Sequence, residues 1–354
     1  RSSAASDVYK RHNEFSARLF VGLCAWGCIL LTFAMGSYLY DEKTGLYSAG
    51  VLSTFLYLYV LGRMNILDIP LTFFVGLATW AGYRYMVGER LVKSWLYLLY
   101  AASALAFLTK GLIGIIFPFA ILVLWLLVSK KGRDIFKLIS PVGLLILAAI
   151  VFPWIILVQR ANKIFLWYFF VYQHFLRYAT KIHGRYQFIL FYLPVVVLGI
   201  FPWIAYLIQA IRAKHAGLYN VVFGRMKLSF LITWIVFIFI FFSVSSSKLI
   251  PYIAPIFLPL AVILGHLFRG YDEQEWRPLR KMTDKLYHHL PVIVQSLLFS
   301  ACLLYTSDAA DDLLCVDLGG RRIITKKKKK KKHNNKRAKH TTQHTPEHDC
   351  CTQA

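Results

Sequence analysis

Apolar stretches of about 20 residues recur along residues 18–305, and they constrain the fold more than any other feature of the chain. About 20 apolar residues in a helix cross the hydrocarbon core of a bilayer. Hydrophobic residues make up 58% of the chain and charged residues 16%, whereas about 25% of a soluble domain is charged. The mean hydropathy is +0.53. The sequence therefore predicts an all-α fold, a polytopic transmembrane helical bundle.

We predict about ten spans, with boundaries expected to shift by about three residues. They cover residues 18–40, 44–62, 69–87, 93–109, 111–128, 138–158, 188–210, 228–247, 251–268 and 286–305. Residues 18–305 form the expected transmembrane domain. Residues 1–17 are polar and start with Arg1, so we expect them to be the outer-side end of an upstream segment.

Residues 302–354 differ in composition from the rest of the chain. Their first part, 302–332, resembles a translated sequencing adapter followed by poly(A), since AAA encodes lysine and seven lysines occupy 326–332. The alternative is a disordered basic tail that binds nucleic acid or anionic lipid. We favour the artefact and exclude this tail from the fold prediction. No nucleic-acid partner is therefore predicted.

The basic residues between the spans divide unequally between the two sides of the membrane. Alternation of the spans places 17 Lys and Arg on one side and 12 on the other. The side richer in Lys and Arg faces the cytoplasm in most membrane proteins. The predicted cytoplasmic loops therefore include residues 129–137, 211–227 and 269–285, and the segment 159–187 is predicted to lie outside.

Seven ionisable residues gather at the predicted outer rim of the spans: Arg63, Asp68, Lys110, His174, Arg177, His183 and Lys248. A charge near the hydrocarbon core costs about 2.5–3.5 kcal/mol on insertion scales, so such residues usually mark a pathway or a site. Their one-sided placement is not required by composition. The outer rim is therefore the predicted functional region.

Three of these residues occupy two turns that have simple structural alternatives. Arg63 and Asp68 lie between the second and third spans, where they either form an ion pair within a polar turn or supply a buried acid to a polar cavity. Lys110 precedes Gly111 at a span end, where a lysine often extends to water. Neither turn identifies a function by itself.

The outer segment 159–187 combines aromatic and basic residues. Aromatic side chains at this density suit the headgroup level of a membrane, so we expect an interfacial helix at the outer face. His174 and Arg177 are three residues apart and would share one helix face. This pairing suits a phosphate whose lipid tail lies in the bilayer.

The segment from Ser245 to Tyr252 is the most specific of the local patterns. A serine run, Lys248 and Pro251 predict a sharp turn at membrane depth. Non-helical backbone at that depth is tolerated only where it is buried in protein or lines a cavity. The segment is therefore predicted to be enclosed by neighbouring helices.

Together these patterns resemble the GT-C type integral-membrane glycosyltransferases. The resemblance is closest to the branch with bacterial 4-amino-4-deoxy-L-arabinose transferases and relatives of protein O-mannosyltransferases (glycosyltransferase families 39 and 83), and it covers residues 15–270. The matching positions are Arg63 and Asp68 in R-x-x-x-x-D, Lys110 in L-x-K-G, His174, Arg177 and His183 in E-H-F-x-R-[FY]…H, and Lys248 and Tyr252 in S-x-S-K-L-x-x-Y-x-x-P.

The resemblance implies transfer of a sugar from a polyprenyl-phosphate donor on the outer face of the cytoplasmic (inner) membrane. The acceptor would be lipid A, a protein or another glycan. The implied catalytic residues are Asp68 and His183, and the implied donor-phosphate ligands are Lys110, Arg177, Lys248 and Tyr252. Arg63 and His174 would support them. No cofactor is required, although His183, and with it His174, could instead bind a divalent metal ion.

The chain departs from the family pattern in two places. The glutamate before the family's histidine is Gln173 here. The family's first outer loop, with an acidic residue proposed as the base, would lie upstream of Arg1, so we expect a chain without it to bind the donor but catalyse little. The alternatives are a transporter or lipid flippase, whose polar sites usually lie near the membrane midplane, and a structural scaffold.

Overall fold

A computed structural model describes residues 14–64, 66–88, 91–167, 169, 188–204, 226–245 and 248–272. All structural statements below concern these residues. The chain divides into two units, Arg1–Pro291 and Val292–Ala354, and every described residue belongs to the first unit.

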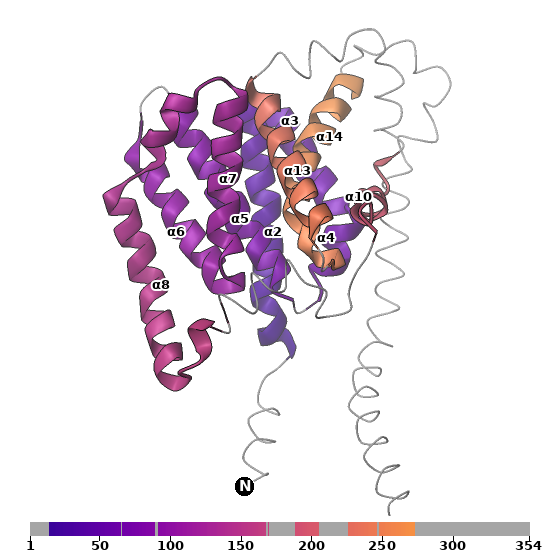
Figure 1. Ribbon diagram of the computed structural model, residues 1–354. Helices are drawn as coiled ribbons and strands as arrows, with labels where there is room; N and C mark the ends of the chain where they lie inside the picture. Colours follow the sequence, from indigo (N-terminus) through magenta and orange to yellow (C-terminus); the bar gives the residue numbers. More distant parts are fainter. Residues whose placement is uncertain are drawn as a thin grey trace, which may run out of the picture. The chain divides into compact units, whose positions relative to one another are not determined.

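Helices form nearly all of the described part, in which no strand occurs, so the predicted all-α class is confirmed (Figure 1). The α-helices are α2 (Glu14–Leu39), α3 (Glu42–Thr54), α4 (Leu56–Leu61), α5 (Asp68–Val87), α6 (Lys93–Lys110), α7 (Ile113–Val128), α8 (Pro141–Ala161), α10 (Tyr192–Gly199), α13 (Met226–Val244) and α14 (Phe257–Asp272). Two 3₁₀ helices, η1 (Gly132–Leu138) and η3 (Ile250–Ile256), complete the set.

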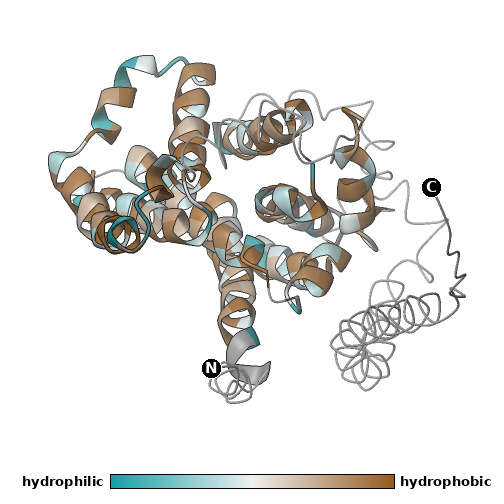
Figure 2. Ribbon diagram, turned by 60° about the horizontal axis from the view of Figure 1, so that its bottom comes forward, coloured by the Kyte–Doolittle hydropathy of each residue, from teal (hydrophilic) through white to brown (hydrophobic). Residues whose placement is uncertain are grey.

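Several described helices are long and apolar enough to cross a membrane. They cover Arg18–Leu39, Pro141–Ala161, Lys227–Val244 and the combined η3–α14 segment Ile250–Arg269. Apolar residues occupy most of the length of each helix, and hydrophilic residues gather at helix ends and turns (Figure 2). The chain is therefore a multi-pass membrane protein, as predicted.

Helix α5 forms the centre of the bundle, and α8 lies at its edge. α5 contacts α2, α6, α7 and η3, whereas α8 packs mainly against α6. On α8, Leu145, Phe152 and Leu157 are 69%, 57% and 66% exposed. In a membrane protein such apolar side chains face lipid. The polar residues of α5 therefore lie inside the protein, and α8 meets the bilayer.

The predicted span 44–62 is wrong as a single helix, because it breaks into α3 and α4 at Phe55. Phe55 has an extended backbone, with φ −61° and ψ 125°. The N–H of Leu56 donates to the carbonyl of Phe201 at 3.1 Å. The Trp203 indole N–H donates to Thr54 Oγ1 at 2.6 Å. The segment around Phe201 thus supplies the hydrogen bonds that lipid cannot provide.

Two further spans differ from the prediction. The span 188–210 contains the 8-residue helix α10, which ends at Gly199 in a turn, and residues 205–210 lie outside the described part. The span 251–268 starts as the 3₁₀ helix η3, which contains Pro251 and Pro255 and continues as α14 from Phe257. The span 286–305, the tail 302–354 and most of the expected interfacial helix lie outside the described residues.

Small residues bring α2, α3 and α14 into close backbone contact. A Cβ atom on Gly36 of α2 would lie 2.9 Å from the Gly45 Cα of α3. A Cβ on Gly265 of α14 would lie 2.6 Å from the Ser48 nitrogen of α3. Small residues at such crossings stabilise membrane helix pairs through close packing. We call these four residues the small-residue seam.

We predict that Gly45→Ala destabilises the protein. The added methyl would lie 2.7 Å from the Phe33 carbonyl oxygen and 2.9 Å from the Ser37 nitrogen, so the α2 backbone would have to move. Overpacking of this kind costs about 1–3 kcal/mol. The measurement is the thermal unfolding midpoint of the purified protein in detergent.

The matched control is Gly50→Ala on the same helix, since a Cβ there meets nothing within 4 Å. This control should leave the midpoint unchanged or raise it, because alanine favours helix over glycine. Equal losses for the two variants would contradict the seam as a packing constraint.

We predict opposite labelling of single cysteines at the two ends of α8. Asn162→Cys lies at the predicted outer end, and Lys131→Cys precedes the predicted inner end; both positions are exposed. An impermeant thiol reagent on intact cells should label position 162 only, and permeabilised cells should show both. Labelling of 131 alone in intact cells would reverse the orientation.

Candidate functional site

An ion pair between Asp68 and Lys110 forms the centre of the candidate site. Asp68 is the first residue of α5 and Lys110 is the last residue of α6. Because the two helices are adjacent and antiparallel, these ends meet, and the Lys110 ammonium contacts Asp68 Oδ1. The Asp68 side chain is 12% exposed and the Lys110 side chain is 26% exposed. Each charge also lies at the helix end whose dipole it complements.

Gly111 explains how Lys110 is placed at a sharp helix end. Its φ of 84° lies in the region that side chains disfavour, and its N–H donates to the Phe107 carbonyl at 2.7 Å. The chain then enters α7 at Ile113. The Lys-Gly pair therefore ends α6 and leaves the lysine at the rim of the bundle.

Tyr252 packs against the same lysine. The Lys110 ammonium lies 4.4 Å from the centroid of the Tyr252 ring, within the range of a cation–π contact. Tyr252 belongs to η3, and η3 packs on α5 and α13. Residues far apart in the sequence thus meet at one end of the bundle, and Asp68 and Lys110, both predicted at the outer rim, are in contact.

Lys248 occupies a buried, non-helical segment between α13 and η3. The residue is only 5% exposed, and its ammonium donates to the Ser245 carbonyl at 2.8 Å. Burial lowers the pKa of the Lys248 ammonium, because the charged form loses solvation. The enclosed turn expected from the sequence is therefore present. We refer to Asp68, Lys110, Lys248 and Tyr252 as the outer-end cluster.

Two tyrosines that the sequence analysis did not identify hold the backbone next to Lys248. The Tyr57 hydroxyl donates to the Ile250 carbonyl at 2.8 Å. The Tyr192 hydroxyl donates to the Leu249 carbonyl at 3.1 Å and accepts from the Leu249 N–H at 3.2 Å. These bonds span more than fifty positions of sequence, so no local pattern could have revealed them.

Among the remaining predicted residues, the structure describes only Arg63, which lies outside the cluster. Arg63 is exposed near the end of α4, where its guanidinium lies 3.9 Å from the Tyr59 ring centroid. The alternative of an Arg63–Asp68 ion pair is wrong for the described structure, because Asp68 pairs with Lys110. His174, Arg177 and His183 lie outside the described residues.

Metal binding stays a prediction. Among the residues that the structure describes, no group of three or more His, Cys, Asp or Glu side chains could hold a metal ion. His183, the residue for which a divalent ion was considered, is not among them. Asp68 contributes a single carboxylate, and that carboxylate already pairs with a lysine.

Comparisons with known proteins agree with the geometry. Residues 6–157 match a family model described as dolichyl-phosphate-mannose-protein mannosyltransferase. The undecaprenyl phosphate-alpha-4-amino-4-deoxy-L-arabinose arabinosyl transferase 1 of Proteus mirabilis is 32% identical over 66% of this chain and 40% of its own length. Its counterpart in Erwinia tasmaniensis is 28% identical over 72% of this chain and 46% of its own length.

A solved structure is also similar. The crystal structure of ArnT from Cupriavidus metallidurans bound to undecaprenyl phosphate aligns with a TM-score of 0.65 and 25% identity, over 74% of this chain and 48% of that one. This chain resembles the GT-C arabinose transferase group. The resemblance inferred from the motifs is therefore confirmed, and the transporter alternative gains no support from these relatives.

The chain spans less than half the length of the relatives named here. The family match ends at residue 157, so it includes Asp68 and Lys110 but neither Lys248 nor Tyr252.

We predict strong energetic coupling between Asp68 and Lys110. Removing one partner of a buried ion pair leaves an uncompensated charge and costs about 3 kcal/mol. Asp68→Asn and Lys110→Met should each destabilise the protein, and the double variant should lose less than the sum, with a coupling of about 1–3 kcal/mol. Denaturant titration in micelles measures the cycle.

The matched control is the exposed pair of Asp134 and Lys137, 2.7 Å apart, with side chains 30% and 49% exposed. The same substitutions there should show a coupling below about 0.5 kcal/mol. A coupling at Asp68–Lys110 no larger than this control would show that the pair stabilises the fold no more than an exposed pair does.

Proposed function

We propose that this chain forms the donor-binding membrane part of a glycosyltransferase that uses a polyprenyl-phosphate sugar. The observation that carries the proposal is the contact of Lys110 with Asp68 and Tyr252 at one end of an apolar bundle, with Lys248 buried in the segment that leads into the helix of Tyr252. Further support comes from relatives named as undecaprenyl phosphate-dependent arabinosyl transferases. The proposal places the sugar-phosphate at this end and the polyprenyl chain along the lipid-facing helices.

The proposed reaction needs positive charge at the leaving group. When the bond between the sugar C1 and the phosphate oxygen breaks, the departing polyprenyl phosphate gains negative charge. Ammonium groups held in a site from which water is excluded stabilise that charge more in the transition state than in the ground state. This preference for the transition state is what accelerates the reaction.

Lys248 is the lysine best suited to contact the phosphate. Lys248 is buried, and its ammonium donates to the neutral Ser245 carbonyl at 2.8 Å. A phosphate carries the opposite charge, and the attraction between the two charges is stronger in a buried setting than in water. The two tyrosines that anchor Leu249 and Ile250 keep the adjacent backbone in place, so little has to reorganise when the donor binds.

Lys110 has a different electrostatic setting. Its charge is balanced by Asp68 and its position is limited by the Tyr252 ring. The ion pair with Lys110 supports a role for Asp68 in orienting that lysine. We therefore assign Lys110 to a second contact with the phosphate, and Tyr252 to the placement of that lysine.

The residues outside the described part keep the roles that the family resemblance implies. Arg177 would contact the donor phosphate, His183 would act in catalysis or bind a divalent ion, and His174 would support them. The proposed acceptor is lipid A, with a protein or glycan acceptor as the alternatives. The proposed location is the outer face of the inner membrane.

We predict that Lys248→Ala weakens binding of undecaprenyl phosphate more than tenfold, which corresponds to about 1.4 kcal/mol. Loss of the ammonium removes the charge that the phosphate contacts. Titration of the purified protein with undecaprenyl phosphate in detergent measures the affinity. Sugar transfer to lipid A tests the activity when the same substitutions are made in a complete enzyme that contains this membrane part.

Lys248→Arg should retain part of the affinity, since the charge remains while its geometry changes. The control is Lys131→Ala, an exposed lysine at the opposite end of the bundle, which should bind like the wild type. Wild-type affinity in Lys248→Ala would contradict the assignment of the phosphate to this lysine. Lipid translocation without sugar transfer in reconstituted vesicles would contradict the transferase itself.

A further inference from the structure

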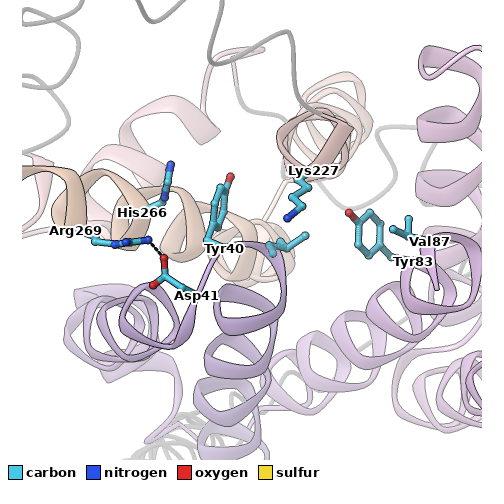
Figure 3. A pocket seen from close by; sticks show the side chains of 8 residues that line it. Tyr40, Asp41, Tyr83, Val87, Lys227, His266 and Arg269 are labelled. Carbon is cyan, nitrogen blue, oxygen red and sulfur yellow. Dashed lines mark ion pairs between the residues drawn. The ribbon is translucent and has the colours of Figure 1, made fainter. Parts of the chain in front are cut away.

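A cavity of about 510 Å³ lies at the end of the bundle opposite to the outer-end cluster. It is formed where α2 and α5 end, α3 and α13 begin, and α14 ends (Figure 3). Its described lining consists of Leu39, Tyr40, Asp41, Tyr83, Val87, Lys227, His266 and Arg269. The charge distribution predicts that this end faces the cytoplasm. We call it the inner cavity.

The acidic side chain of the described lining is already engaged. Asp41 pairs with Arg269 and also caps α3, where its Oδ1 accepts from the Thr44 N–H at 2.8 Å. The Tyr40 ring stacks on the His266 ring, with centroids 3.9 Å apart and an interplanar angle of 15°. These contacts make one wall of the inner cavity a fixed structure that joins α2, α3 and α14.

The opposite wall presents hydrogen-bond donors. Figure 3 shows the Lys227 ammonium directed from α13 into the space between Tyr40 and Tyr83, with the Tyr83 hydroxyl directed toward it. Lys227 is an exposed residue, so a ligand can reach it from the surface. With Arg269 balanced by Asp41, Lys227 gives the described lining a net positive charge. Such a lining favours an anion.

We propose that the inner cavity binds the phosphate headgroup of an anionic phospholipid. A phosphodiester accepts hydrogen bonds from an ammonium and from phenol hydroxyls, and it carries the charge that Lys227 requires. The volume lies within the range of about 300–1,000 Å³ that is typical of small-molecule sites. The site differs from the proposed donor site in position and in ligand, because it lies at the other end of the helices.

The position of the inner cavity favours lipid over a soluble anion. The cytoplasmic leaflet carries anionic lipids, and basic pockets between transmembrane helices on that side bind their headgroups. Leu39 and Val87 supply apolar lining beside the donors, as the glycerol and the first acyl carbons of a lipid require. A soluble phosphate would use the donors alone.

Thermal unfolding of the whole purified protein in nanodiscs tests the proposal. Nanodiscs of phosphatidylcholine are compared with nanodiscs that contain phosphatidylglycerol. Because a ligand that binds only the folded state raises the midpoint, phosphatidylglycerol at a hundredfold excess over its Kd should raise it by about 5 °C. Lys227→Gln should lose most of this rise, and Lys227→Arg should keep it.

The matched control is Lys93→Gln. Lys93 is an exposed lysine at the start of α6, near the same predicted side of the membrane, and it does not line the inner cavity. This control separates a specific headgroup site from general attraction between a basic protein and an acidic bilayer. A full response in Lys93→Gln with a lost response in Lys227→Gln supports the site.

Three outcomes would overturn the proposal. The first is a wild-type protein whose midpoint does not respond to phosphatidylglycerol. The second is an equal loss of response in Lys227→Gln and Lys93→Gln, which would identify nonspecific attraction. The third is an equal rise with soluble glycerol phosphate in phosphatidylcholine nanodiscs, which would identify a soluble phosphate as the ligand. None of these readouts depends on sugar transfer.

Discussion

The arrangement of this protein depends on the absence of hydrogen-bond partners in lipid. Every backbone group that leaves a helix inside the membrane must find a partner within the protein. The Phe201 carbonyl accepts the hydrogen bond of the Leu56 N–H at the break after Phe55, and two tyrosine hydroxyls bond the backbone of Leu249 and of Ile250, where η3 begins. The irregular segments that build the outer-end cluster exist because distant residues satisfy them.

Much of the architecture could be predicted from the sequence because the bilayer imposes a simple rule on length and composition. Span positions follow from apolar runs, and the buried turn at Lys248 follows from serine and proline chemistry at membrane depth. Asp68 and Lys110 were identified separately, as polar residues at helix ends. Their pairing required knowledge that α5 and α6 are antiparallel neighbours, which the topology of successive spans supplies.

Other features could not be predicted, because they arise from contacts between distant segments. Tyr57 and Tyr192 lie in apolar runs that read as ordinary span residues, and only the folded bundle brings their hydroxyls to the backbone near Lys248. The helix break within 44–62 has no proline or glycine at Phe55 to signal it. Asp41 and Arg269 are likewise far apart in the sequence, and only the folded bundle pairs them in one wall of the inner cavity.

The small-residue seam has a mechanical consequence. Long side chains at a helix contact can change rotamer and let two helices slide, but Gly36, Gly45 and Gly265 have no side chains to rearrange. Displacing α2, α3 or α14 relative to the others therefore separates backbones directly and forfeits contact at once. The three helices therefore form a rigid unit.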